Sequence, residues 1–199
     1  MSQILLLQSS LNGPASRTNQ LMERFLQTRR EQGHQDQVVV RDLTALDLPV
    51  LDSPLFHALR GAEPVNEAIR QAVALSDRLI AELKAADLLL IGAPMYNLNV
   101  PTPLKNWFDL VARAGVTFRY TDTYPMGLVE GVNALVFSSR GGVHQGQTTD
   151  AVTPYLKSVL GLMGITEVEF VYAEGMDLRP HGAEQGMREA HARIAGLGR

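Results

Sequence analysis

Five short apolar runs, set apart by longer stretches of a different pattern, constrain the fold of this chain more than any other feature. The runs occupy residues 4–7, 38–40, 88–91, 134–137 and 168–171. Apolar runs of this length suit parallel strands that are buried on both faces. Between the runs, apolar residues recur at helical spacing. This spacing predicts helices over residues 18–32, 65–85, 103–112, 149–162 and 184–195. The alternation predicts an α/β fold with a doubly wound, five-stranded parallel sheet.

The expected order of the strands is 2-1-3-4-5, because right-handed crossovers permit it, and it places a topological switch between the first and third strands. No linker, repeat or low-complexity segment interrupts the pattern, so residues 1–199 are expected to form one domain. Residues 47–64, between the second and third strands, contain three prolines and no clear periodicity. We expect this insertion to cover a surface or a partner chain.

Composition excludes several classes of function. The chain has 18 Lys plus Arg against 21 Asp plus Glu, and its net charge of -3 offers no basic surface for nucleic acid or an anionic membrane. It has no cysteine, which excludes disulfides, Cys-ligated iron–sulfur clusters and thiolate nucleophiles. No apolar run approaches the ~20 residues that span a bilayer, and the first residues read as a strand rather than a signal peptide, so we expect a cytoplasmic protein. Any redox chemistry therefore needs an organic cofactor.

A hydroxyl-rich loop follows the first strand and ends where a helix is predicted to begin. It contains Ser10, Ser16, Arg17 and Thr18. The first N–H groups of a helix have no partner within it and carry partial positive charge, so these hydroxyls, with Arg17 as a cation, can wrap a phosphate. The alternative is that Ser16 or Thr18 only caps the helix. The pattern is neither Gly-x-Gly-x-x-Gly nor a P-loop, which disfavours a dinucleotide or a nucleoside triphosphate.

A second loop, after the third strand, carries Met95, Tyr96, Asn97 and Leu98. A thioether, an aromatic ring and amides can supply the flat apolar contact and the polar partners that a flavin ring needs. The alternative is an ordinary Pro-Asn turn with Met95 and Tyr96 in the core.

Paired glycines mark a third loop, which follows the fourth strand and contains Ser139, Arg140, Gly141 and Gly142. Bare glycine N–H groups can meet an anionic ring nitrogen without a side chain intervening. A glycine turn without a ligand is the alternative. The position of the loops favours ligand binding, because all three follow strands at the carboxyl edge of the sheet, where sheets of this class bind ligands.

His144, at the end of the third loop, can orient a substrate or donate a proton to it, with an ordinary surface histidine as the alternative. The five histidines form no His-x-x-x-His pair, which disfavours a metal site. A hydrolytic triad of Ser138, Asp150 and His144 is a weak hypothesis, because the sequence lacks a Gly-x-Ser-x-Gly elbow.

Aromatic residues gather after the third strand. Helical spacing around Trp107 is typical of core packing. Phe118 and Tyr120 lie in a short extended segment, where aromatic side chains can wall a substrate pocket or a dimer contact. Arg60, in the insertion, is a candidate for contact with a substrate or a 2′-phosphate, with an exposed surface arginine as the alternative.

Taken together, these motifs resemble the bacterial FMN-dependent NADH azoreductases, a family of quinone and azo-compound reductases with a flavodoxin-like fold. The resemblance spans nearly the whole chain and is weakest from Asp177 onward, a stretch to which we assign no chemistry. Residues 112–121 and the Arg-Gly-Gly loop together are its most specific parts. The matching segments are residues 9–10, 16–20, 93–97, 104–109, 112–121 and 139–144.

The resemblance implies a flavodoxin-like three-layer sandwich with FMN as its cofactor. By this resemblance, Ser10 and residues 16–18 hold the FMN phosphate, residues 95–98 line the isoalloxazine, and residues 139–142 meet its polar edge. Family members often carry an aromatic residue where this chain has Leu98, which implies a pocket that is roomier or less able to stack a substrate. The resemblance further implies a homodimer whose pockets are completed by both subunits.

The predicted function is a two-step, ping-pong reaction. NADH or NADPH leaves a hydride on FMN N5 and departs, and a quinone or azo compound then takes two electrons in the same place. One alternative is a flavodoxin-type electron carrier, although such carriers are usually more acidic than a net charge of -3 implies. The other is a flavin-free interaction module. The sequence does not choose between NADH and NADPH, and it does not identify the physiological acceptor.

Overall fold

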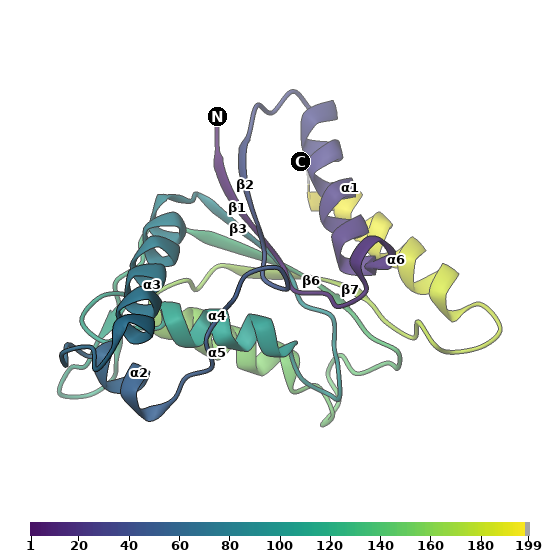
Figure 1. Ribbon diagram of the computed structural model, residues 1–199. Helices are drawn as coiled ribbons and strands as arrows, with labels where there is room; N and C mark the ends of the chain where they lie inside the picture. Colours follow the sequence, from purple (N-terminus) through teal and green to yellow (C-terminus); the bar gives the residue numbers. More distant parts are fainter. Residues whose placement is uncertain (198–199) are drawn as a thin grey trace.

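A parallel five-stranded sheet forms the centre of the computed structural model, which describes residues 1–197 (Figure 1). The strands stand in the order β2-β1-β3-β6-β7, and every neighbouring pair is parallel. In sequence terms this order is 2-1-3-4-5, so the predicted fold class and strand order are confirmed. The strands are β1 (Gln3–Gln8), β2 (Gln37–Asp42), β3 (Leu88–Gly92), β6 (Asn133–Ser139) and β7 (Val168–Ala173).

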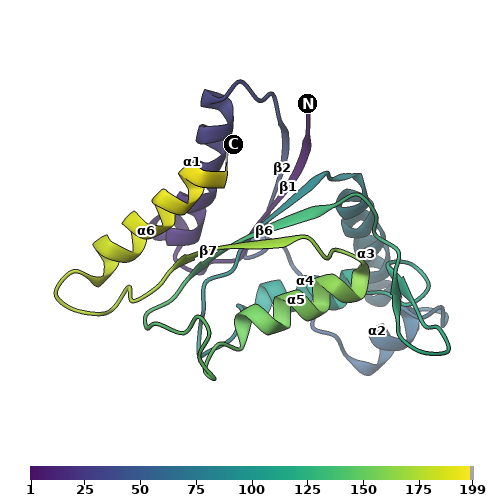
Figure 2. The same cartoon turned by 180° about the vertical axis from the view of Figure 1, so that it is seen from behind.

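Helices cover both faces of the sheet and complete three layers (Figures 1 and 2). On one face lie α1 (Arg17–Glu31) and α6 (Gly182–Leu197). On the other lie α3 (Glu67–Ala85), α4 (Thr102–Val111) and α5 (Val152–Met163). Each helix begins within three residues of its predicted start, so the spacing of apolar residues locates these helices well.

Alternation along the strands divides the core into two clusters. Successive side chains of a strand point to opposite faces, so Leu5 and Leu7 pack with α3, α4 and α5, while Ile4 and Leu6 pack with α1 and α6. All four side chains are buried. The sequence predicts that the strand at 38–40 is buried on both faces, but the valines of β2 are 37 to 47 % exposed. It lies at the edge of the sheet, where a neighbouring strand exists on one side only.

Side-chain caps fix where two of the helices begin. Ser16 Oγ accepts a hydrogen bond from the Asn19 N–H (3.1 Å) at the start of α1. Asn66 Oδ1 accepts one from the Ile69 N–H (2.9 Å) at the start of α3. Each bond satisfies an N–H group that has no acceptor inside its own helix. The first of these caps also places the hydroxyl-rich loop at the carboxyl edge of the sheet.

The sequence predicted the extended segment at Phe118, but it predicted neither the pairing of that segment with a second strand nor a helix in the insertion. The insertion at 47–64 contains a helix, α2 (Ser53–Ala58), whose Leu55 is buried in the core cluster on the α3 side. An antiparallel hairpin pairs β4 (Phe118–Arg119) with β5 (Met126–Gly127). The hairpin strands have two residues each, and a helix of six residues makes fewer than two turns, so none of these elements shows a readable period.

Among residues 1–197, no helix is long and apolar enough to cross a bilayer. The domain predicted over residues 1–199 includes residues 198 and 199, which lie outside the described part of the chain.

Candidate cofactor site

A cleft of about 330 Å³ opens at the carboxyl edge of the sheet, where four loops meet. The loops follow β1, β3, β6 and β7, so the edge predicted from register does carry a cleft. Six of the predicted cofactor-binding residues line it, namely Arg17, Met95, Tyr96, Ser139, Arg140 and Gly141. The other predicted cofactor-binding residues belong to the same loops, which places all of them at this edge of the sheet.

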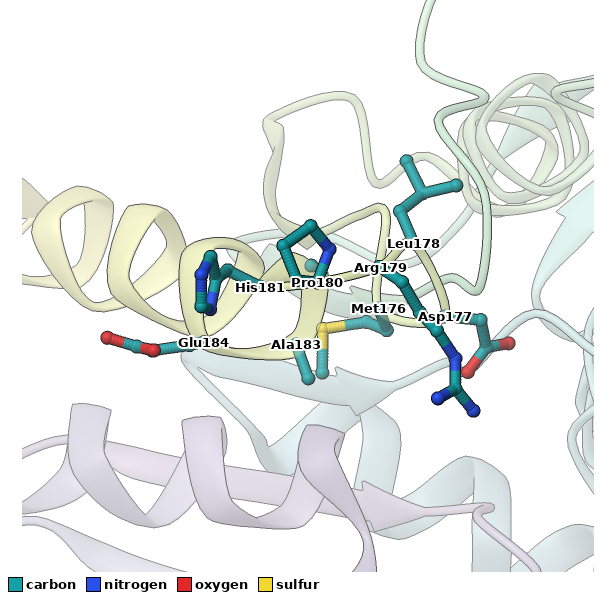
Figure 3. A pocket seen from close by; sticks show the side chains of 9 residues that line it. Met176, Asp177, Leu178, Arg179, Pro180, His181, Ala183 and Glu184 are labelled. Carbon is teal, nitrogen blue, oxygen red and sulfur yellow. The ribbon is translucent and has the colours of Figure 1, made fainter.

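The loop after β7 is a part of the cleft that sequence reasoning missed. Met176, Asp177 and Ala183 line the cleft, although no chemistry was assigned to the stretch from Asp177 onward. The available clue was topological, because β7 is a parallel strand like the others and its carboxyl end must reach the same edge. The larger hollow beside the cleft, about 630 Å³, is lined by residues 176–184 alone (Figure 3). No predicted site residue lines that hollow, so the smaller cleft is the candidate site.

At one end of the cleft, the start of α1 presents two buried hydroxyls. Ser16 Oγ and Thr18 Oγ1 lie 3.1 Å apart, and both residues are fully buried. The capping role proposed for Ser16 is therefore real, but a hydroxyl that accepts from an N–H can still donate its own proton. One proton of the pair joins the two hydroxyls, and the other is available to a ligand. Arg17 lines the cleft beside these hydroxyls, and the positive end of α1 lies behind them, so this group of residues is the candidate for an anion site.

The loop after β3 is tied to the loop after β1 by the Tyr96 hydroxyl. This oxygen lies 3.2 Å from Ser10 Oγ and accepts a hydrogen bond from the Leu11 N–H (3.1 Å). The phenol thus holds two cofactor loops at a fixed separation, and its ring is half-buried. The sequence predicted that Tyr96 makes flat contact with a flavin ring. It did not predict this bridging role, because the bridge depends on tertiary structure.

A tight turn carries residues 97 and 98, directly after the cleft-lining residues 94–96. Tyr96 and Asn99 exchange two backbone hydrogen bonds, of 2.9 and 3.0 Å. Asn97 and Leu98 both adopt left-handed conformations, with φ of 50° and 64°. Asparagine tolerates this conformation, but leucine does so at a cost of about 1–2 kcal/mol. Leu98 is also half exposed. Backbone strain combined with an exposed apolar side chain is typical of a functional position.

The loop after β6 brings bare backbone to the cleft. Within residues 1–197, the N–H groups of Gly141 and Gly142 have no hydrogen-bond acceptor, so both are available to a ligand. A Cβ on Gly141 would lie 2.3 Å from Asp177 Oδ2, and one on Gly142 would lie 2.8 Å from His144 Nε2. Both neighbouring atoms are the ends of side chains, so a Cβ at either position would require Asp177 or His144 to shift.

Arg140 contributes backbone rather than side chain to the cleft. Its guanidinium is fully buried and forms ion pairs with Asp150 (3.0 Å) and Glu174 (3.2 Å). It also stacks on the Tyr172 ring, 4.6 Å from the ring centroid. Burial acts to raise the pKa of the Asp150 carboxyl, but hydrogen bonds from the backbone and side chain of Thr153 and from Arg140 outweigh it and lower that pKa.

His144 lies beside the cleft and takes no part in a hydrolytic triad. Its Nδ1 is 2.8 Å from Thr149 Oγ1. Asp150 pairs with Arg140 instead of the imidazole, and Ser138 Oγ accepts a hydrogen bond from the same guanidinium (3.2 Å). The triad hypothesis is therefore wrong. In the described part of the chain, no three His, Asp or Glu side chains are grouped so that they can hold a metal ion.

The three predicted substrate-pocket residues lie away from the cleft of this chain. Phe118 is buried and meets Tyr120 edge to face, with ring centroids 5.5 Å apart, while Tyr120 is 69 % exposed. Arg60 stacks on Phe56 at 3.5 Å and lines a separate hollow of about 130 Å³. Within one chain, these residues therefore do not face the cofactor cleft.

Comparisons with known proteins agree with this architecture. A family described as having the flavodoxin-like fold matches residues 2–197. FMN-dependent NADH:quinone oxidoreductase 4 of Burkholderia lata is 66 % identical over 197 residues, which is 99 % of each chain. The FMN-dependent NADH:quinone oxidoreductase of Aeromonas salmonicida is 52 % identical over 99 % of each chain. An azoreductase structure from Bacillus anthracis has a TM-score of 0.86 at 29 % identity and covers 100 % of this chain and 99 % of its own. The resemblance inferred from the motifs is confirmed, and the chain belongs to the flavodoxin-like family of FMN-dependent NADH:quinone oxidoreductases.

Proposed function

We propose that this protein is an FMN-dependent oxidoreductase that transfers two electrons from NADH or NADPH to quinones and azo compounds. The names of its relatives support this, since those at 52 to 66 % identity over nearly the full chain are FMN-dependent NADH:quinone oxidoreductases. The single observation that carries the proposal is the cleft, whose polar groups match the polar ends of FMN. We further propose that the protein acts in the cytoplasm, where the nicotinamide donor is available.

The residues present fit FMN at both ends of the cleft. Ser10, Ser16, Thr18 and the cation of Arg17 would hold the phosphate at the start of α1. In the segment 139–142, the free N–H groups of Gly141 and Gly142 would meet the polar edge of the ring. Asn19 Oδ1, in the first turn of α1, is a buried acceptor without a hydrogen-bond partner in the described residues. It lies close in sequence to the phosphate loop and can accept a hydrogen bond from a hydroxyl group of the cofactor.

When bound, FMN supplies the difficult chemistry, which is two-electron exchange at its N5. The residues at 95–98 would provide the wall against the ring, with Leu98 at the mouth where an acceptor enters. His144 would orient the acceptor or supply it with a proton, because its Nε2 lies over Gly142. Donor and acceptor would occupy the same place in turn, which makes the kinetics ping-pong.

We also propose a homodimer. Support comes from large apolar side chains that are exposed although they flank no cleft of their own chain, including Tyr120, Tyr124 and Met126 around the β4–β5 hairpin. A second copy would cover them and bring Arg60 or Phe118 near a neighbouring cleft. Light scattering should give twice the 21.8 kDa mass of one chain, and a monomer at micromolar concentration would reject this proposal.

The enzyme proposal is tested by spectrum and kinetics together. The protein purified with FMN should show a bound-flavin spectrum and should reduce quinones with NADH or NADPH, with parallel lines in double-reciprocal plots. Intersecting lines would reject the shared place for donor and acceptor. A colourless protein that does not take up added FMN would reject the enzyme and favour an interaction module. Bound FMN without quinone turnover, but with electron transfer to a protein partner, would favour an electron carrier.

A further inference from the structure

A buried ion cluster lies beneath the loop after β6 and has no part in the proposed function so far. Arg140, Asp150 and Glu174 form it, and their side chains are 0, 7 and 13 % exposed. The Arg140 guanidinium also donates to Thr153 Oγ1 (2.9 Å). One guanidinium and two carboxylates leave the cluster with one net negative charge in a poorly hydrated place. Such a cluster is costly to bury, so its presence calls for a role beyond packing.

Glu174 connects this cluster to the cofactor loop. Its Oε1 accepts hydrogen bonds from the backbone N–H groups of His144 and Gln145, both at 2.8 Å, as well as from Arg140 at 3.2 Å. Three donors thus converge on one carboxylate oxygen, and two of them belong to the loop. Hydrogen bonds to a charged acceptor are roughly twice as strong as neutral ones. The turn that carries His144 is therefore fixed to β7 by the Glu174 side chain.

Backbone bonds complete the attachment of the loop to the end of β7. The Met176 N–H donates to the Arg140 carbonyl (3.0 Å), the Asp177 N–H to Gly141 (3.0 Å) and the Gly175 N–H to Gly142 (2.9 Å). In these bonds the loop supplies carbonyl oxygens, which leaves the N–H groups of the two glycines free. Gly141 itself lines the cleft, so its N–H group stays available there while its carbonyl is bonded to the loop after β7.

We propose that Glu174 is a positioning residue that presents the free glycine N–H groups and His144 to the flavin, with Arg140 as its fixed counter-ion. This inference rests on the proposed function, because it assumes that FMN occupies the cleft. The charge of the cluster should also affect the reduction potential of the flavin. A flavin gains negative charge when it is reduced, so the excess negative charge of the cluster disfavours the reduced cofactor. Removing one carboxylate charge should raise the reduction potential of the bound flavin.

The experiment compares Glu174→Gln with Glu169→Gln. Both glutamates lie at or just beyond β7, but Glu169 is exposed and pairs with Arg193 on the surface. FMN affinity is measured by quenching of flavin fluorescence, and the midpoint potential by equilibration with a dye. For E174Q we expect about tenfold weaker binding of oxidised FMN and a tenfold shift in relative affinity toward reduced FMN, which equals about 30 mV for a two-electron couple. E169Q should change neither quantity.

A purely structural role predicts a different result, namely a lower melting temperature with unchanged potential and affinity, and that result would overturn the inference. If E174Q does not fold, Glu174→Asp is the second variant. It keeps the carboxylate charge, but its shorter side chain moves the carboxylate oxygen away from the N–H groups of His144 and Gln145. It should therefore weaken FMN binding with little change in the midpoint potential of the flavin. Amide hydrogen exchange of the wild-type apoprotein is a further test that needs no variant, since the N–H groups of His144 and Gln145 should be protected. Fast exchange there would also overturn the inference. Failure of the wild-type protein to bind FMN would instead refute the proposed function and leave the exchange result standing.

Discussion

Replacing Ser16 by alanine separates the two tasks that one hydroxyl performs. In the apoprotein, Ser16 Oγ caps α1 through the Asn19 N–H, and in the proposed complex it also donates to the FMN phosphate. Loss of a serine cap costs about 1 kcal/mol. For a chain of this length, that corresponds to a fall in melting temperature of about 2–4 °C.

The effect on cofactor binding should exceed the effect on folding. A hydrogen bond to a charged group contributes about 1.5–3 kcal/mol. Since 1.4 kcal/mol is a factor of ten, the Kd of FMN should rise about tenfold or more in S16A. Melting in saturating FMN adds a second measure, because a ligand that binds only the folded state stabilises it by an amount that falls as its Kd rises. The holoprotein should therefore lose more stability than the apoprotein.

Asn66→Ala is the matched control, since Asn66 caps α3 through the Ile69 N–H at 2.9 Å and belongs to none of the cofactor loops. Its melting temperature should fall by a similar amount and its Kd for FMN should not change. Calorimetric titration of both variants with FMN measures the difference. Equal FMN affinities for S16A and N66A would refute the assignment of Ser16 to the phosphate site.

Two further predictions concern the glycine loop and an ion pair. Gly141→Ala adds a methyl group to a residue that lines the cleft, beside the N–H group proposed to meet the flavin, so FMN binding should weaken about tenfold or more, whereas Gly161→Ala, in helix α5 with open space around it, should stabilise the fold by about 0.5–1 kcal/mol and leave FMN binding unchanged. Equal FMN affinities in a titration would contradict this. Asp36 accepts two hydrogen bonds from Arg29 (2.6 and 2.9 Å), which lower the pKa of its carboxyl. A carboxyl with a lowered pKa stabilises the fold above its unfolded pKa, about 3.9, and this stability disappears as the pH falls through the folded pKa. Asp36→Asn should therefore cost about 1.5–3 kcal/mol at pH 7 and progressively less below about pH 4, as measured by urea unfolding. A difference that does not depend on pH would reject the ion pair as its cause.

Regular elements of this fold were predictable because burial leaves a periodic trace in the sequence. The strand at 88–91 is apolar throughout because helices cover both of its faces, and the order of the sheet follows from crossover handedness. Helix α2 was missed because its six residues make fewer than two turns, and the pairing of β4 with β5 was missed because two residues on each strand carry no pattern. Local pattern identifies elements that are long enough to repeat it.

At the candidate site, loop composition and register located the right edge of the sheet but not the task of each side chain. Arg140 was expected at the cofactor, yet its guanidinium forms ion pairs with two carboxylates inside the fold. The decisive partners, Asp150 and Glu174, lie 10 and 34 residues away in the chain, so no local motif reveals them. Asp177 was overlooked because it belongs to no recognisable motif, and only the folded sheet brings it to the cleft.

The left-handed turn at Asn97 and Leu98 has a consequence for how such a site can diversify. The cost of the turn at residue 98 lies in its backbone, with φ of 64°, and is much the same for any side chain that is not branched at Cβ. Exchanging leucine for an aromatic residue there would change the side chain that the turn exposes while leaving the stability of the fold nearly unchanged. In the proposed function, where an acceptor meets this side chain, acceptor preference and fold stability can therefore vary independently. A lineage could explore new substrates there without first acquiring compensating changes in the core.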